Sequence, residues 1–295
     1  MSKTVLATIT TYNPEIGLLE KNIDAVKGQV DKLIVYENAS ANRDEVLRLC
    51  EEKNAEVVCN DKNYGVAGPL HDGIDYAAEN GYDYILTLDQ DSVASAGMVD
   101  KLIELIKSDE NLAIVAANPV PATSAESESV PVENVSVDSV YTSGMLADVG
   151  KIKSIGNYMP EMFIDWVDDE ICYRAKECGY GILQSGIPLI HRLGDLQKAR
   201  FLWKKIYVQN YSEFRYYHIF RNGYYCIERY GKRKDLVKRC KRRLTKAKLK
   251  VILYEKNKAS KLKAMKQGKR DAEKFFADMR RKYEFAKGEA DRQKR

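Results

Sequence analysis

Short strand-like runs alternate with helix-like runs through the first 110 residues of the chain. The strand-like runs are continuous apolar stretches rather than half-polar alternations, and they read TVLATIT, KLIVYEN, AEVVCN and YILTLD. The helix-like runs between and after them span residues 15–29, 43–54, 68–81 and 96–110. Continuous apolar strands separated by helices are typical of a parallel sheet that is covered on both faces. We therefore predict an α/β fold with a mostly parallel sheet flanked by helices.

Each predicted strand is followed by a polar loop. The four loops read TTYNPE, YENAS, NYGVAG and LDQDS, and in parallel sheets ligands bind beyond the carboxyl ends of the strands. We therefore expect the four loops to meet at one edge of the sheet. In the last loop Asp89 and Asp91 have two interpretations: they are turn residues that bond to nearby backbone, or they are oxygen ligands of a hard cation.

The charge of the chain is divided unevenly along its length. Residues 232–295 hold 26 Lys and Arg against 8 Asp and Glu, a net +18, whereas residues 1–231 hold 22 against 35, a net −13. The basic tail has no Pro and little Gly, so it should be helical. Apolar residues recur in it at roughly helical spacing, which predicts one or more basic amphipathic helices; they are Leu236, Cys240, Leu244, Val251, Ile252, Phe275, Phe276, Met279 and Tyr283. The alternative is a helix that packs on residues 1–231 of the same chain or on a second chain.

The composition excludes several classes of protein. A hydrophobic fraction of 44% and a charged fraction of 31% are those of a globular protein, not of a disordered chain. The six Cys form no Cys-x-x-Cys pair, so neither a zinc site nor a disulfide framework is supported. No signal-like segment and no apolar stretch of about 18 residues is visible, so we expect a cytoplasmic protein.

With these motifs in place, the chain resembles the inverting family 2 glycosyltransferases of the GT-A fold, and among them the bacterial rhamnosyltransferases that use dTDP-rhamnose. The resemblance runs from Thr10 to about Asn222. It implies a GT-A, Rossmann-like catalytic domain over residues 1–231, with a nucleotide-sugar half to about 118 and an acceptor half over about 119–231. The Ser- and Pro-rich segment 119–140 would hold variable loops and strands. The basic tail, residues 232–295, would be a separate helical extension.

The resemblance also implies which residues hold the donor. The family's first two loops bind the nucleotide, and its third loop, with the helix start that follows, lies beside the diphosphate, where free N–H groups favour anions. The implied nucleotide-sugar contacts are Thr11, Tyr12, Asn13, Glu37, Asn38, Asn63, Gly65, Asp89 and Gln90. Glu37 stands where the family has Asp, and its alternative interpretation is a solvated charge at a strand end. His71 stands where the family has Asn, and a lone His is more often a packed residue.

The family's metal-binding Asp-x-Asp falls on Asp89 and Asp91. We therefore expect Mg²⁺ or Mn²⁺, which would neutralise the charge that gathers on the leaving diphosphate. Asp91 would be the direct ligand, and Asp89 would reach the ribose or a metal-bound water. His191 is a further candidate ligand because family members often bring a His to this position.

A second carboxylate cluster, FIDWVDDEICYRA, resembles the family segment that carries the catalytic base. The implied base is Asp168, with Asp165 as the second candidate; the alternative is an ordinary acidic helix start. Glu170 would orient the acceptor or the structure, and it is spaced for an i,i+4 pair with Arg174. The implied acceptor or phosphate contacts are Ser143, Gly144, Asp165, Glu170, Arg221 and Asn222.

Taken together, the resemblance implies transfer of rhamnose to a saccharide acceptor, lipid-linked, in bacterial cell-surface polysaccharide synthesis. The enzyme would lie at the inner face of the cell membrane, held to anionic lipid by its tail. Three alternatives remain: a UDP-sugar donor, a non-catalytic nucleotide-binding module, and a nucleic-acid binder. We expect no nucleic-acid partner because the body has no base-reading module. Whether the chain forms a homo-oligomer stays open.

Overall fold

The computed structural model describes residues 4–121, 133–191, 197–201, 204–208 and 210–293. Half of the Ser- and Pro-rich segment 119–140, namely residues 122–132, lies outside the described residues. The chain forms two compact units: Met1–Phe163 with Val167–Arg192, and Ile164–Trp166 with Leu193–Arg295. The second unit therefore includes α7 (Glu213–Arg229), which precedes the change in charge at residue 232. The division by packing thus differs from the division by charge.

The first unit is built on a nine-stranded sheet of order β3-β2-β1-β4-β8-β6-β9-β5, with β7 paired to β9. The first four strands pair in parallel, as predicted, and β8 then pairs antiparallel with both β4 and β6. The strands are β1 (Val5–Thr11), β2 (Lys32–Glu37), β3 (Glu56–Cys59), β4 (Tyr84–Asp89), β5 (Ser92–Ala94), β6 (Leu112–Pro121), β7 (Val135–Ser136), β8 (Met145–Asp148) and β9 (Gly181–His191).

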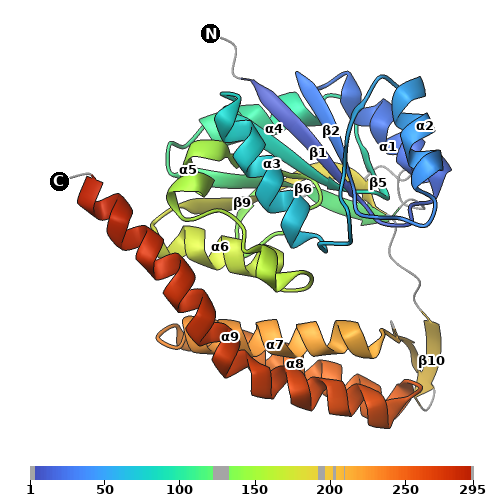
Figure 1. Ribbon diagram of the computed structural model, residues 1–295, viewed down its shortest axis with the longest axis vertical. Coiled ribbons are helices and arrows are strands. Elements are labelled where there is room, and N and C mark those ends of the chain that lie inside the picture. The colour runs from blue at the N-terminus through green and yellow to red at the C-terminus, as the bar shows by residue number, and fades with distance from the viewer. Residues whose placement is uncertain (1–3, 122–132, 192–196, 202–203, 209, 294–295) are drawn as a thin grey trace. The chain divides into compact units, whose positions relative to one another are not determined.

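Helices cover both faces of this sheet (Figure 1). On one face Val5, Ala7 and Ile9 of β1 join a core with buried residues of α1 (Ile16–Lys27), α2 (Arg43–Glu52) and α4 (Met98–Lys107). On the other face Thr8 and Ile85 approach Gly73 of α3 (Ala67–Glu79), and α5 (Val149–Ser154) packs beside α3. Because side chains alternate along a strand, a sheet buried on both faces needs the continuous apolar strands seen in the sequence.

The strand register fixes where the polar loops emerge. Thr11 of β1 is the partner of Glu37 of β2, Glu37 is also the partner of Cys59 of β3, and Thr10 is the partner of Asp89 of β4. All four strands therefore end at the same edge of the sheet. This confirms that the four loops meet at one edge.

Among its described residues, the second unit contains three long helices and a pair of antiparallel strands. Helix α7 packs closely with α8 (Lys234–Tyr254) and α9 (Lys258–Gln293), while β10 (Gln197–Phe201) and β11 (Lys204–Val208) form an antiparallel pair. Figure 1 shows α8 and α9 running alongside α7. A Cβ on Gly268 of α9 would meet the Tyr217 carbonyl oxygen of α7 at 2.3 Å, so the two backbones come into close contact.

The predicted helices of the tail are thus confirmed, but much of their apolar stripe is used inside the unit. Leu236, Cys240, Leu244 and Val251 are buried, and Phe275 makes an edge-on ring contact with Tyr225 of α7. The stripe therefore packs within the chain, on α7. This was one of the alternatives that the sequence left open. Among the described residues, no helix has the length and apolar character needed to cross a bilayer.

Candidate active site

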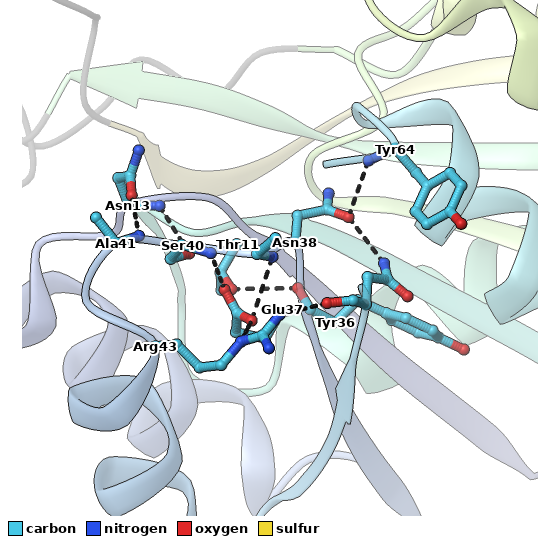
Figure 2. A network of polar contacts seen from close by, with 11 residues as sticks. Thr11, Asn13, Tyr36, Glu37, Asn38, Ser40, Ala41, Arg43 and Tyr64 are labelled. Atoms are coloured by element: carbon cyan, nitrogen blue, oxygen red, sulfur yellow. Dashed lines mark hydrogen bonds and ion pairs between the residues drawn. The ribbon is translucent and has the colours of Figure 1, made fainter. Parts of the chain in front are cut away.

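The loop after β2 is organised around Glu37, whose side chain is fully buried. Its carboxylate accepts hydrogen bonds from the backbone N–H groups of Ala39 (3.2 Å) and Ser40 (2.5 Å) and from Arg43 Nε (2.6 Å), as Figure 2 shows. Burial raises the pKa of Glu37, but the bonds from Ser40 and Arg43 outweigh it and hold the pKa below its ordinary value. The acid is thus ionised and satisfied by hydrogen bonds from its own loop.

Further hydrogen bonds join this loop to its neighbours (Figure 2). Asn13, which has a positive φ of 48°, accepts a bond from the Ala41 amide at 2.7 Å and donates its own N–H to Ser40 Oγ at 2.9 Å. The amide of Asn38 donates to the Gly65 carbonyl at 2.8 Å, so the second loop also holds the third. Three loops far apart in sequence are therefore held as one surface.

Burial separates the implied donor contacts into two groups. Thr11, Glu37 and Asn38 are at most 1% exposed, and the Thr11 hydroxyl donates to the Tyr36 carbonyl. These three side chains are therefore enclosed by the loops, which their hydrogen bonds shape. Part of the side chain remains accessible at Tyr12, Asn13, Asn63, Asp89 and Gln90. Of these, Gln90 accepts the Tyr12 amide at 2.7 Å, which ties the first loop to the fourth.

The start of α3 is already occupied by a backbone group. The Phe163 carbonyl accepts from the Val66 amide at 2.8 Å and from the Ala67 amide at 3.2 Å. A Cβ at Gly65, where φ is +68°, would meet that oxygen at 2.1 Å, which explains the need for Gly. The expectation that this helix start offers free N–H groups to a diphosphate is therefore wrong for Val66 and Ala67. His71 beside it contacts the Tyr158 carbonyl at 2.7 Å and is a packed residue.

Asp89, Asp91 and His191 come together at the edge where β4 ends. One ligand atom from each lies within 4.8 Å of the others, and all three side chains are half-buried. Asp89 is the last residue of β4, and the short strand β5 pairs with the end of β9, so that Ser92 and His191 are register partners. Carboxylate oxygens and an imidazole nitrogen are suitable ligands for Mn²⁺, and the carboxylates also suit Mg²⁺. The residues therefore fit a divalent cation.

Two buried hydroxyl groups support this cluster. Ser92 Oγ lies 2.8 Å from His191 Nδ1 and 2.6 Å from Ser143 Oγ, which in turn accepts the Asp89 amide at 3.0 Å. Ser143 is therefore a support of the cluster and not the acceptor contact that the resemblance implied. The adjacent Gly144 is buried, and a Cβ there would meet Leu189 Cδ2 at 2.7 Å, so its role is also in packing. Ser92 was not among the site residues expected from the sequence, although it directly follows Asp91.

The three acidic residues at the start of α6 (Val167–Glu177) differ in accessibility. Asp169 is 9% exposed and accepts the Ser139 hydroxyl at 3.0 Å. Glu170 is 2% exposed and forms a buried ion pair with Arg174 at 2.5 Å, which confirms the i,i+4 pair and gives Glu170 a structural role in place of an acceptor contact. Asp168 alone of the three is partly exposed.

Helix α7 holds the segment that directly precedes α6. The side-chain amide of Asn222 donates to the carbonyls of Ile164 and Asp165, each at 2.9 Å, while the Trp166 indole donates to the Ile219 carbonyl at 2.9 Å. The Asp165 carboxylate pairs with Arg215 at 3.1 Å. Both Asp165 and Trp166 have positive φ, at 62° and 65°, a conformation that non-glycine residues keep only when surrounding contacts enforce it.

These contacts give two of the implied site residues partners within the protein. Asn222 is fully buried, and its amide bonds to backbone and positions the chain. Arg221 donates to Asn222 Oδ1 at 2.9 Å and lies 4.2 Å from the centre of the Phe275 ring. Arg215 was missed, because nothing in its local sequence distinguishes it.

Comparison with known proteins agrees with this geometry. Residues 7–139 match the family model for glycosyl transferase family 2. The chain is 29% identical over 216 residues to the dTDP-rhamnosyl transferase RfbF of Shigella flexneri, a match that covers 66% of this chain and 71% of that protein. It is similar in fold, with a TM-score of 0.52 at 11% identity, to the crystal structure of GalNAc-T7 with UDP, GalNAc and Mn²⁺. That match covers 65% of this chain and 44% of the other. Residues 7–139 therefore form a domain similar to glycosyl transferase family 2, on a GT-A-like fold, and together these findings support a glycosyltransferase.

Proposed function

We propose that the protein is an inverting glycosyltransferase that moves rhamnose from dTDP-rhamnose to a saccharide acceptor carried on a lipid. The observation that carries the reaction class is the Asp89, Asp91 and His191 cluster at the edge where the parallel strands end. The similarity to a dTDP-rhamnosyl transferase supports the choice of sugar. The runner-up is a UDP-sugar donor, because the accessible loop residues do not by themselves distinguish the two nucleotides.

In this proposal Asp91 and His191 hold the divalent cation, and Asp89 completes the site or reaches the ribose. The cation would offset the negative charge of the diphosphate leaving group. Tyr12, Asn13, Asn63 and Gln90 would contact the nucleotide, since their side chains are accessible at the same loops.

Asp168 is the proposed general base. Its carboxylate takes the proton of the acceptor hydroxyl while that oxygen forms a bond to the anomeric carbon, and the bond from this carbon to the diphosphate oxygen breaks on the opposite face. One proton acceptor is sufficient, because the diphosphate leaves as an anion. Asp168 is partly exposed whereas the two acidic residues that follow it, Asp169 and Glu170, are buried, and this difference supports the assignment.

The cation is tested by chelation and by one substitution. Sugar transfer and donor hydrolysis should stop in EDTA and return with Mn²⁺ or Mg²⁺, and Asp91→Ala should abolish both while the fold persists. Asp100→Ala, which removes an exposed carboxylate from the first turn of α4, is the control. Unchanged turnover in excess EDTA would overturn the metal assignment. Thermal shifts with dTDP-rhamnose and with UDP-sugars, each with metal, would then identify the donor.

The lipid-linked acceptor implies that the protein works at an anionic membrane surface. Supporting observations are the net +18 of residues 232–295 and the exposure of Leu249 (50%) and Leu253 (53%) on α8. Because α8 and α9 pack on α7, deletion of the tail would uncover buried residues such as Tyr225 and Cys226. Surface substitutions are therefore a better test than truncation.

The variant Lys263→Gln, Lys266→Gln and Lys274→Gln removes three exposed charges from α9. It should pellet less with phosphatidylglycerol vesicles, since each basic residue near an anionic surface contributes about 1 kcal/mol. The control removes three exposed charges from the first unit, at Lys21, Lys101 and Lys107. Equal pelleting of the two variants, or binding that is insensitive to salt, would contradict the membrane proposal.

A further inference from the structure

The second unit contains a cavity of about 530 Å³ whose wall is strongly basic. Five of the residues that line it are Arg239, Arg242, Arg243, Lys246 and Lys250, all from α8. The other lining residues include Tyr211, Tyr216 and Ile219, and one carboxylate, that of Asp165. The whole lining comes from the second unit.

The five cations gather there because of their spacing in the helix. Positions 239, 242, 243, 246 and 250 follow the i, i+3, i+4 pattern, which places them on one face of α8 over three turns. Leu236, Cys240, Leu244 and Val251 are buried on a different face. The same helix thus packs through one side and presents a column of positive charge on another.

The cavity retains an excess of positive charge. Five cations and one carboxylate line it, and that carboxylate, of Asp165, is paired with Arg215. Like charges three or four residues apart on a helix destabilise it, and a bound anion would relieve this cost. Arg243 is oriented by stacking over the Trp166 ring at 4.2 Å, and a guanidinium group is suited to bind phosphate oxygens in pairs.

The carboxyl-terminal end of the same helix adds an apolar component. Leu249 and Leu253 lie three residues beyond Lys246 and Lys250 respectively, and both are about half exposed. Helical spacing places Leu253 close to the direction of the basic column. A ligand with a charged head and an apolar chain matches this order of charged and then apolar side chains.

We propose that this cavity binds the phosphate or diphosphate group of an amphipathic ligand, namely the lipid carrier of the acceptor. The naming of the ligand rests on the function proposed above, whereas the anion site rests on the cavity alone. The site would place a discrete head group on α8, in addition to any diffuse attraction to the membrane.

The test uses the full-length protein in EDTA, so that no metal can hold an anion at the donor loops. Binding of inorganic pyrophosphate and of farnesyl diphosphate is measured by calorimetry. The test variant is Arg242→Gln with Lys246→Gln. The control is Lys241→Gln with Lys248→Gln, which removes the same charge from exposed positions of α8 that do not line the cavity.

We expect the cavity variant to bind both probes about tenfold more weakly or worse, because it loses charge-assisted hydrogen bonds to the anion. The control should bind like the wild type. Tighter binding of farnesyl diphosphate than of pyrophosphate identifies a lipid head group as the source, and equal binding identifies a soluble diphosphate. Equal weakening in both variants, or no binding to the wild type, would overturn the site.

A separate measurement keeps this result independent of the proposed function. The thermal shift produced by dTDP-rhamnose with Mn²⁺ is recorded for the same proteins. A wild type that binds pyrophosphate but not the nucleotide sugar would count against the proposed donor and leave the anion site standing. The reverse pattern would count against the cavity alone.

Discussion

Ser92 and His191 are register partners on β5 and β9, and the Ser92 hydroxyl lies 2.8 Å from Nδ1 of the imidazole. A hydrogen bond to a ring nitrogen fixes the orientation of the ring, and the same Nδ1 lies 3.8 Å from Asp91 Oδ1. The pairing of β5 with β9 thus holds His191 in place at the candidate cation site.

Replacement of Ser92 by Ala should weaken Mn²⁺ binding by about tenfold or more, since partners that orient a metal-binding His typically contribute that much. Calorimetric titration of the full-length protein with MnCl₂ measures it. Ser95→Ala is a matched control, because the Ser95 hydroxyl bonds to the Pro188 carbonyl and does not contact His191. Equal affinity in both variants would remove Ser92 from the site.

Substitution of Asp168 by Asn should lower turnover by about a hundredfold or more, because general-base catalysis contributes at least that factor. Affinity for the nucleotide sugar should stay near that of the wild type, which calorimetry with the donor alone would show. If Asp168→Asn turns over normally and Asp165→Asn does not, the base is Asp165, and its ion pair with Arg215 then belongs to the mechanism.

Replacement of Glu37 by Gln should reduce the free energy of unfolding at pH 7 by about 2 kcal/mol, because bonds to its buried charge are lost. The pKa of Glu37 is below its ordinary value, so its ionised form stabilises the fold above the unfolded pKa near 4.5. That contribution disappears as the pH falls through the lower, folded pKa. The difference between wild type and variant in urea unfolding should therefore shrink in acid.

The control for this measurement is Glu45→Gln, at an exposed position in the first turn of α2. Its stability should follow that of the wild type across the same pH range. A difference between wild type and Glu37→Gln that stays constant from pH 7 to pH 3 would show that the charge of Glu37 does not stabilise the loop.

Replacement of Gly268 by Ala should destabilise the second unit by several kcal/mol, because the new Cβ would lie 2.3 Å from the Tyr217 carbonyl oxygen. Thermal unfolding of the variant measures the effect. Gly17→Ala on α1, where a Cβ would meet nothing within 4 Å, should be neutral or stabilising. A Gly268→Ala protein as stable as the wild type would mean that α9 does not pack on α7 in solution.

The sequence determined the local features of this protein. Continuous apolar runs predicted the first four strands, and the lack of Pro in the tail predicted α8 and α9. The position of Asp89 and Asp91 at the end of a strand is likewise a local feature, independent of where that strand lies in the sheet. Backbone propensity and hydrophobic period act over a few residues, so they can be read from a single segment. Resemblance to known motifs extended this to the reaction class and to the candidates Asp168 and His191.

Only the tertiary structure decided which polar side chains remain accessible. Glu37, Asn38 and Asn222 are of residue types that often bind ligands. In the structure each is buried and forms hydrogen bonds with backbone groups or, for Glu37, also with Arg43. In the same way the column of cations on α8 acquires a cavity only when Tyr211 and Asp165 fold against it. Burial and hydrogen-bond satisfaction arise from contacts between remote parts of the chain, and local sequence carries no measure of them.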